Sequence, residues 1–135
     1  MSYERGSAHE PGVVTKTSPL PVEAAAARLT ETVRARGMKL FAVVDQGAEA
    51  RAVGLELRET VLVLFGNPAA GTPVMAASPL SALDLPLKVV VWDDGGETRV
   101  SYYSPATIAA RHGLSAELAK NLAGIDVLTD AIVSP

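Results

Sequence analysis

The sequence contains no cysteine among its 135 residues. A disulfide framework, a thiolate nucleophile and a zinc or iron–sulfur centre held by cysteine are therefore excluded. Histidine is scarce as well, since the chain has only His9 and His112, and neither has a carboxylate at helical spacing. We therefore expect no metal site and no cofactor.

An excess of one charge is also missing, because the formal net charge is only −3 and the charged residues are interspersed. No basic face is available to release counterions from a nucleic-acid backbone, so nucleic acid is not an expected partner. No apolar run approaches the roughly 20 residues that span a bilayer, and we expect no membrane association. The opening "MSYERGSAHEPG" lacks the apolar centre of a signal peptide. We interpret residues 1–12 as a flexible leader and expect a cytoplasmic protein.

Familiar catalytic motifs are absent too. The sequence has no Gly-Lys-Ser/Thr phosphate loop, no G-x-G-x-x-G, no serine in a strand-turn-helix elbow, and no carboxylate pair at a recognisable acid-base spacing. A catalytic function is therefore unsupported by local motifs, although a site can still be assembled from dispersed residues.

What the sequence does have is apolar residues, which make up 48% of the chain. That is enough to close one core, and we expect residues 13–135 to form a single domain. Helical spacing begins after Pro21 and ends at Gly37. The apolar positions of this helix are Val22, Ala25, Ala26, Leu29 and Val33.

Extended segments are predicted at residues 12–17, 39–45, 60–65, 87–92 and 98–103. Residues 39–45 are apolar on both faces, which favours a central strand. The glycines at 95 and 96 predict a tight hairpin between the last two strands. Further helices are expected at residues 47–53, between Ser104 and Gly113, and from Ser115 onward with Gly124 weakening its middle.

Because the last strands pair as a hairpin rather than through helical crossovers, these elements predict an α+β fold. The expected architecture is a curved, mostly antiparallel sheet with helices on one face.

Several motifs occur together in a fixed order: "FGNP-x-x-GTP", "LDLPLK", "VWDD-x-G" and "ARHGL". With "RLTETVRARGMKLFAVVD" before them, they resemble the family catalogued as domain of unknown function 302, from near Pro21 to the final helix. The resemblance implies a TATA-binding-protein-like fold, strand-helix-four strands-helix. It implies neither DNA binding nor any catalytic residue. Gln46 stands where relatives tend to carry histidine, so any chemistry based on that histidine is missing from this chain.

The stretch "FGNPAAGTP" supplies one candidate site. Asn67 with Pro68 favours a type I turn, and Thr72 followed by Pro73 predicts a helix N-cap and first position. In a functional interpretation, the backbone N–H groups after Thr72 and the Thr72 hydroxyl bind an anion by donating hydrogen bonds to it. In a structural one, the threonine is a cap and nothing more.

Other polar residues interrupt apolar segments. Asp84 and Lys88 flank a proline in "LDLPLK", where they could form an ion pair or place a cation in a pocket. Tyr102 and Tyr103 lie on opposite strand faces, and we assign Tyr102, with Lys88 and Trp92, to a mixed aromatic and cationic patch. His112 is explained by charge–dipole attraction at a helix end or by a place in the same cleft.

The expected function is a non-catalytic homodimer that holds a small polar or anionic molecule in a cleft. The alternatives are an enzyme with an acid-base site made from the lysine, aspartate and histidine, and a protein-interaction module. The residues assigned to the cleft are Asn67, Thr72, Asp84, Lys88, Tyr102 and His112.

Overall fold

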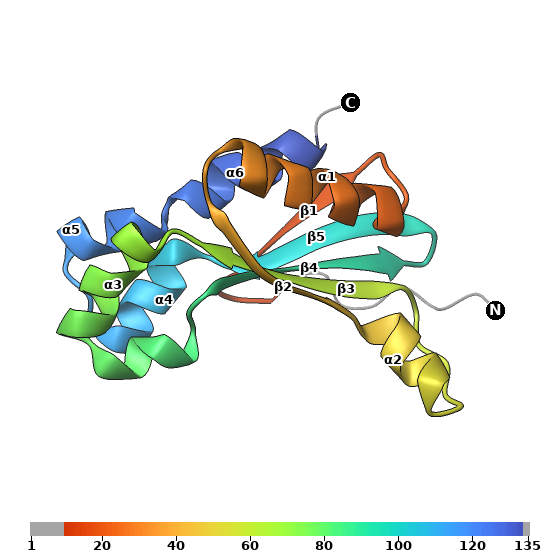
Figure 1. Ribbon diagram of the computed structural model, residues 1–135, viewed down its shortest axis with the longest axis horizontal. Helices are drawn as coiled ribbons and strands as arrows, with labels where there is room; N and C mark the ends of the chain where they lie inside the picture. The colour runs from red at the N-terminus through yellow and green to blue at the C-terminus, as the bar shows by residue number, and fades with distance from the viewer. Residues whose placement is uncertain (1–9, 134–135) are drawn as a thin grey trace.

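A computed structural model of the chain describes residues 10–133. Five strands form one sheet in the order β1-β5-β4-β3-β2, and every neighbouring pair is antiparallel (Figure 1). The α+β fold with an antiparallel sheet is therefore confirmed, and it is compatible with the TATA-binding-protein-like arrangement that the resemblance implied. The strands are β1 (Val13–Ser18), β2 (Lys39–Asp45), β3 (Thr60–Gly66), β4 (Leu87–Asp94) and β5 (Glu97–Tyr103).

The helices fall into three groups (Figure 1). In the first group, the helices α1 (Val22–Ala35) and α6 (Gly124–Val133) lie across one face of the sheet. The short helix α2 (Gln46–Ala52) projects at one end. At the other end of the sheet gather α3 (Pro68–Ala77), the 3₁₀ turn η1 (Pro79–Leu83), α4 (Pro105–His112), α5 (Ala116–Ala119) and the 3₁₀ turn η2 (Lys120–Leu122).

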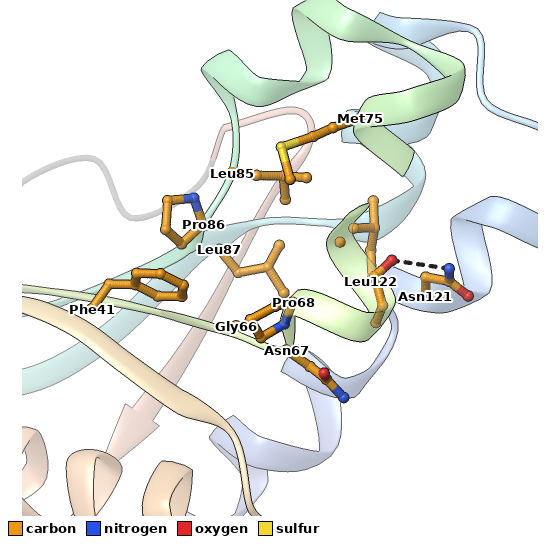
Figure 2. A pocket seen from close by; sticks show the side chains of 12 residues that line it. Phe41, Gly66, Asn67, Pro68, Met75, Leu85, Pro86, Leu87, Asn121 and Leu122 are labelled. Carbon is orange, nitrogen blue, oxygen red and sulfur yellow. Dashed lines mark hydrogen bonds between the residues drawn. The ribbon is translucent and has the colours of Figure 1, made fainter. Parts of the chain in front are cut away.

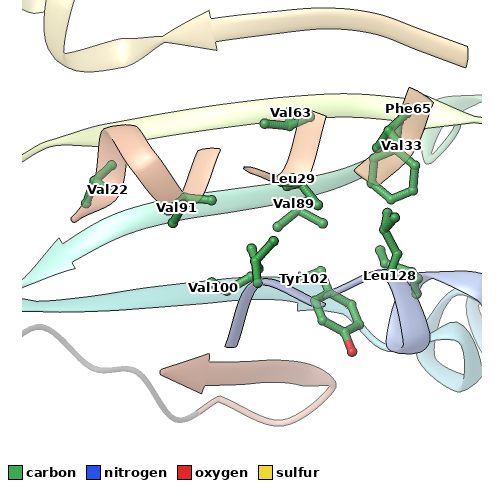
Figure 3. Packing of buried hydrophobic residues seen from close by; sticks show 13 residues of the cluster. Val22, Leu29, Val33, Val63, Phe65, Val89, Val91, Val100, Tyr102 and Leu128 are labelled. Atoms are coloured by element: carbon green, nitrogen blue, oxygen red, sulfur yellow. The ribbon is translucent and has the colours of Figure 1, made fainter. Parts of the chain in front are cut away.

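The main core lies between α1, α6 and the covered face of the sheet. The five apolar residues that predicted α1 are all buried, which confirms the helix and its stripe. Alternate residues of the strands meet this stripe, as Figure 3 shows for Val63, Val89 and Val100 around Leu29. Burying large apolar side chains in this way is the main source of stability, at roughly 25 cal/mol per Å² of apolar surface.

Strand β2 corrects one prediction. Its apolar residues on both faces favoured a central strand, yet β2 lies at the edge of the sheet, where Phe41 and Val43 are 45% and 47% exposed. The pairing with β3 also slips between Leu40 and Ala42, which leaves Phe41 in a bulge. Apolar residues on both faces of a strand indicate what packs above and below the sheet. They do not specify whether one or two strands pair with it.

The segment after β3 also differs from its prediction, because its helix starts at another residue. Helix α3 begins five residues earlier than predicted, with Asn67 and not Thr72 as its N-cap and Pro68 in its first turn. The Asn67 Oδ1 accepts from the Ala69 N–H at 3.0 Å. Thr72 and Pro73 consequently lie inside the helix, so that Thr72 is not its N-cap and the helix start on which the anion-binding interpretation depended is not at this position. Both Asn-Pro and Thr-Pro are typical helix starts, and the first one is used.

The predicted helices after β5 are confirmed at their starts, but the last one is interrupted. Ser104 caps α4 and Gly113 closes it with φ of +60°, as expected. Ser115 also begins a helix, but what was predicted as one helix is divided into α5, η2 and α6. Leu122, Ile125 and Leu128 are nevertheless buried, since the bends keep the apolar face turned toward the protein.

Candidate functional site

A small pocket of about 240 Å³ lies at the end of the sheet that α3, α4 and α5 surround. Its walls are mostly apolar, and we call it the polar pocket after the two charged residues that line it, Asp84 and Lys88. It forms where η1 leads into β4 and where β5 leads into α4. The pocket combines charged side chains with buried apolar walls, which is the composition expected of a ligand site. Its lining residues are Leu83, Asp84, Leu87, Lys88, Tyr103, Ile108 and Ile125.

Asp84 connects the two sides of this pocket. Its Oδ2 lies 2.5 Å from His112 Nε2, and Arg111 Nη1 donates to both carboxylate oxygens at 2.9 Å. Helix α4 presents both residues because its last turn ends beside η1, with Gly113 closing the helix. Partial burial acts to raise the pKa of Asp84, but the hydrogen bonds from His112 and Arg111 outweigh it and lower the pKa below its usual value.

Lys88 is the second charged group of the pocket. Its Nζ donates to the Pro86 carbonyl oxygen at 3.1 Å, and within residues 10–133 no carboxylate lies at ion-pair distance from it. Burial lowers the pKa of Lys88, and the Asp84 charge offsets this only in part. The Asp84 charge is bound by Arg111 and His112, which leaves the Lys88 ammonium as the group without a paired carboxylate.

Tyr103 forms the outer wall, and sequence reasoning chose Tyr102 instead. The ring of Tyr103 is half exposed, and the Arg111 guanidinium lies 5.0 Å from its centroid. The hairpin register explains the placement. Val90 pairs with Ser101, and continuing the ladder by two residues puts Lys88 opposite Tyr103. Counting outward from the two turn glycines would have given this register from the sequence alone.

Tyr102 lies on the covered face of the sheet, away from the pocket. Its hydroxyl bonds to Asp126 Oδ1 at 2.5 Å, and Lys16 Nζ stands 5.4 Å from its ring centroid. Burial is the main reason that the pKa of Tyr102 is raised. The patch predicted from Tyr102, Lys88 and Trp92 is therefore wrong, since Tyr102 faces α6 while the other two face the opposite side.

The single cleft expected from six residues is thus corrected. Asp84, Lys88 and His112 come together, whereas Thr72 is exposed on α3 and Asn67 borders a different pocket. Arg111 and Tyr103 complete the polar site. Arg111 was not among the residues assigned to the cleft, and no local motif pairs it with Asp84, because 27 residues separate them in the chain.

The different pocket has a volume of about 200 Å³ and mostly apolar walls (Figure 2). It lies beside the polar one, and the Leu87 side chain belongs to the lining of both. Two neighbouring cavities with mainly apolar walls therefore share one side chain, and they differ in the two charged residues, Asp84 and Lys88, that line one of them.

Residues 10–133 contain no group of three or more His, Cys, Asp or Glu side chains placed to hold a metal ion. His9 lies outside that range. In the same part of the chain, no helix combines the length and the apolar character needed to cross a membrane.

A sequence model of the family described as "Domain of unknown function DUF302" matches residues 14–132. The chain belongs to the DUF302 family. The resemblance drawn from the motifs is thereby confirmed. A crystal structure of an uncharacterized conserved DUF302 protein from Bacillus stearothermophilus superimposes with a TM-score of 0.76 at 19% identity, over 92% of this chain and 97% of that one. At that identity the likeness establishes the fold alone.

Curated relatives of this DUF302 chain carry the name of a channel. It is 39% identical over 111 residues to the fluoride-specific ion channel FluC 1 of Brucella suis biovar 1, covering 80% of this chain and 44% of that protein. The fluoride-specific ion channel FluC 2 of Brucella melitensis biotype 1 matches at the same identity, with 41% of its length covered. The DUF302 chain therefore spans less than half the length of the curated relatives it matches.

Proposed function

We propose that this DUF302 chain is a non-catalytic, cytoplasmic, homodimeric domain that binds a small anion in the polar pocket. The observation that carries the proposal is the charge arrangement around Lys88. Asp84 is bound by Arg111 and His112, and among residues 10–133 the partner of the Lys88 ammonium is the neutral Pro86 carbonyl oxygen. A partly buried ammonium without a carboxylate attracts an anion more strongly than a solvated one, because the surrounding apolar walls screen the charge poorly.

The curated relatives support the same class of ligand. Their names specify fluoride, and the stretch shared with this chain lies within those proteins. A domain that occurs in one chain with an anion channel is a candidate for sensing or buffering a small inorganic anion. Fluoride therefore belongs in the first set of ligands to be tested.

The homodimer is supported by the open face of the sheet, which the helices α1 and α6 leave uncovered (Figure 1). Strand alternation places Leu62, Val90 and Trp92 on this face, and each is only partly buried. The Trp92 indole N–H donates to Ser101 Oγ at 2.9 Å, so a second copy could cover the face without leaving this donor unpaired. Lys88 and Tyr103 lie on the same side, which would place the pocket at the rim of the dimer.

An acid-base enzyme remains the second candidate because of the 2.5 Å contact between His112 and Asp84. A carboxylate that orients a histidine is a common catalytic arrangement. Here, however, Arg111 binds both oxygens of that carboxylate, and His112 is largely buried. The pair is better suited to holding α4 against the entry to β4 than to exchanging protons with a substrate.

The proposal is tested by titrating the protein with fluoride, chloride, acetate and phosphate at constant ionic strength, with backbone amide shifts as the readout. We expect saturable shifts around residues 84–88 and 103 for at least one anion. The charge-removing variant Lys88→Gln should weaken that binding at least tenfold, and binding should also weaken at alkaline pH as the ammonium loses its proton.

The exposed lysine of η2 provides the matched control, and Lys120→Gln should leave the anion affinity unchanged. Equal affinities of the native protein and the Lys88→Gln variant would contradict the proposal. Turnover of a substrate that depends on both His112 and Asp84 would instead favour the enzyme.

A further inference from the structure

The apolar pocket beside Leu87 is built from segments that are far apart in the sequence. Phe41 comes from the bulge of β2, Met75 from α3, Pro86 from the entry to β4 and Leu122 from η2 (Figure 2). A bulge changes the direction in which a strand presents its side chain, and here the Phe41 ring stands beside Pro86 at the edge of the pocket. Four elements therefore converge on a space that none of them fills.

Two glycines of the lining, Gly66 and Gly71, have no side chain to occupy the pocket. Neither Gly66 nor Gly71 has a positive φ, so the backbone does not require glycine at either position. A Cβ on Gly71 would lie 3.9 Å from Met75 Cε and 4.0 Å from Leu85 Cδ1, while one on Gly66 would lie 3.8 Å from Phe41 Cε2. These are ordinary contact distances with the pocket's own side chains, so an added methyl group would line the cavity without a clash.

Gly71 is informative because of its place in the middle of α3. Glycine destabilises a helix interior relative to alanine, through the extra conformational freedom it loses on folding. A residue with a side chain would both strengthen α3 and reduce the cavity. Glycine at this position thus keeps the pocket open at the expense of the helix.

The polar groups at the border of the pocket are engaged with the protein. Asn121 Nδ2 donates to the Ala70 carbonyl oxygen at 3.0 Å, and Asn67 Oδ1 caps α3. The rest of the pocket wall is made of leucine, proline, methionine, phenylalanine, alanine and glycine residues. Such walls favour an uncharged and largely apolar molecule, because a charged or strongly hydrated group would lose its hydration against them.

The volume sets the size of the ligand. An engineered apolar cavity of about 150 Å³ in another protein binds benzene, and the present pocket is about 200 Å³. The methionine thioether and the edge of the Phe41 ring are also favourable contacts for an aromatic ring. We propose that this pocket is a second binding site, separate from the anion site, for a small uncharged apolar molecule of about one substituted aromatic ring.

The experiment is a titration with toluene and with phenol, which have nearly the same shape, followed by backbone amide shifts. We expect toluene to give saturable shifts at Gly66, Gly71 and Asn121, and phenol to bind at least tenfold more weakly. Gly71→Val should reduce toluene affinity at least tenfold and Gly66→Ala at least threefold. The matched control is Ala76→Val, on the same helix at an exposed position, which should leave toluene affinity unchanged.

Lys88→Gln should also leave toluene binding unchanged, which separates this site from the anion site. If Gly71→Val does not fold, the milder Gly66→Ala variant decides. The inference is overturned if toluene does not saturate below its solubility limit, or if both glycine variants bind it as the native protein does. It is also overturned if filling the pocket converts a dimer to a monomer, because the space would then receive a side chain from a second copy.

Discussion

The two faces of the sheet carry similar residues and have different surroundings. On the covered face, Val63, Val89 and Val91 are completely buried under α1 and α6. On the open face, Leu62 and Val90 alternate with them in the same strands and remain partly exposed. The difference shows that strand alternation identifies two apolar faces but does not say which one the chain covers itself.

The largest expected difference in stability comes from a leucine-to-alanine substitution made once on the covered face and once on the open face of the sheet. Leu29→Ala removes a fully buried side chain of α1 and should lower the free energy of unfolding by about 2–5 kcal/mol. Leu62→Ala on the open face should cost roughly 1 kcal/mol in the isolated chain, because its side chain is already partly hydrated. Urea denaturation of both variants measures the contrast.

The difference between the two substitutions can also be measured at several protein concentrations. If a second copy covers the open face, the effect of Leu62→Ala should grow with concentration, while that of Leu29→Ala should change little. Equal costs of the two substitutions at high dilution would mean that the open face is already covered within one chain, and the contrast between the faces would disappear.

A smaller loss of stability is expected from a substitution in the polar pocket, where charged hydrogen bonds and not the burial of apolar surface stabilise the fold. Asp84→Asn should lower the free energy of unfolding at neutral pH by about 1.5–3 kcal/mol, through loss of charge-assisted hydrogen bonds to Arg111 and His112. The pKa of Asp84 is lower in the folded state than its usual 3.8. Its stabilisation is therefore present above pH 3.8 and lost as the pH falls through the folded-state pKa.

The measurement is the unfolding free energy of the native and Asp84→Asn proteins between pH 7 and pH 2. Their difference should be largest near neutrality and should narrow in acid, since the unfolded state then binds more protons than the folded one. A difference that stayed constant over this range would mean that the hydrogen-bond geometry matters and the carboxylate charge does not.

The smallest effect distinguishes the two helix starts in "NPAAGTP". Asn67→Ala should destabilise the protein by about 1 kcal/mol, because it removes the observed cap of α3. Thr72→Ala should change stability by less than about 0.5 kcal/mol, since Thr72 is exposed within the helix. Thermal denaturation compares them. The reverse order would restore Thr72 as the cap.

Much of the fold could be predicted because its signals are local. The apolar stripe of α1, the two glycines at the hairpin, and Ser104 with Gly113 around α4 each specify an element within one short segment. Strand order is not local in this sense. The apolar residues of β2 are the same whether one or two strands flank it, so the sequence could not place it at the edge.

The polar site was predictable in part for a related reason. Asp84 and Lys88 stand out because they are charged residues within an apolar segment, and His112 was assigned to the same cleft. Arg111 joins them only through the packing of α4 against η1, which no spacing along the chain reveals. Tyr103 was within reach of the sequence, since the hairpin register specifies its partner.

The bulge at Phe41 has a consequence for β2 as an outer strand. The free backbone groups of an edge strand form a template on which other chains can add strands, and long regular edges promote fibrous aggregation. The register slip between Leu40 and Ala42 interrupts that template within the strand. The irregularity that places Phe41 beside the apolar pocket thus also makes the outer edge of β2 a poorer template for open-ended polymerisation.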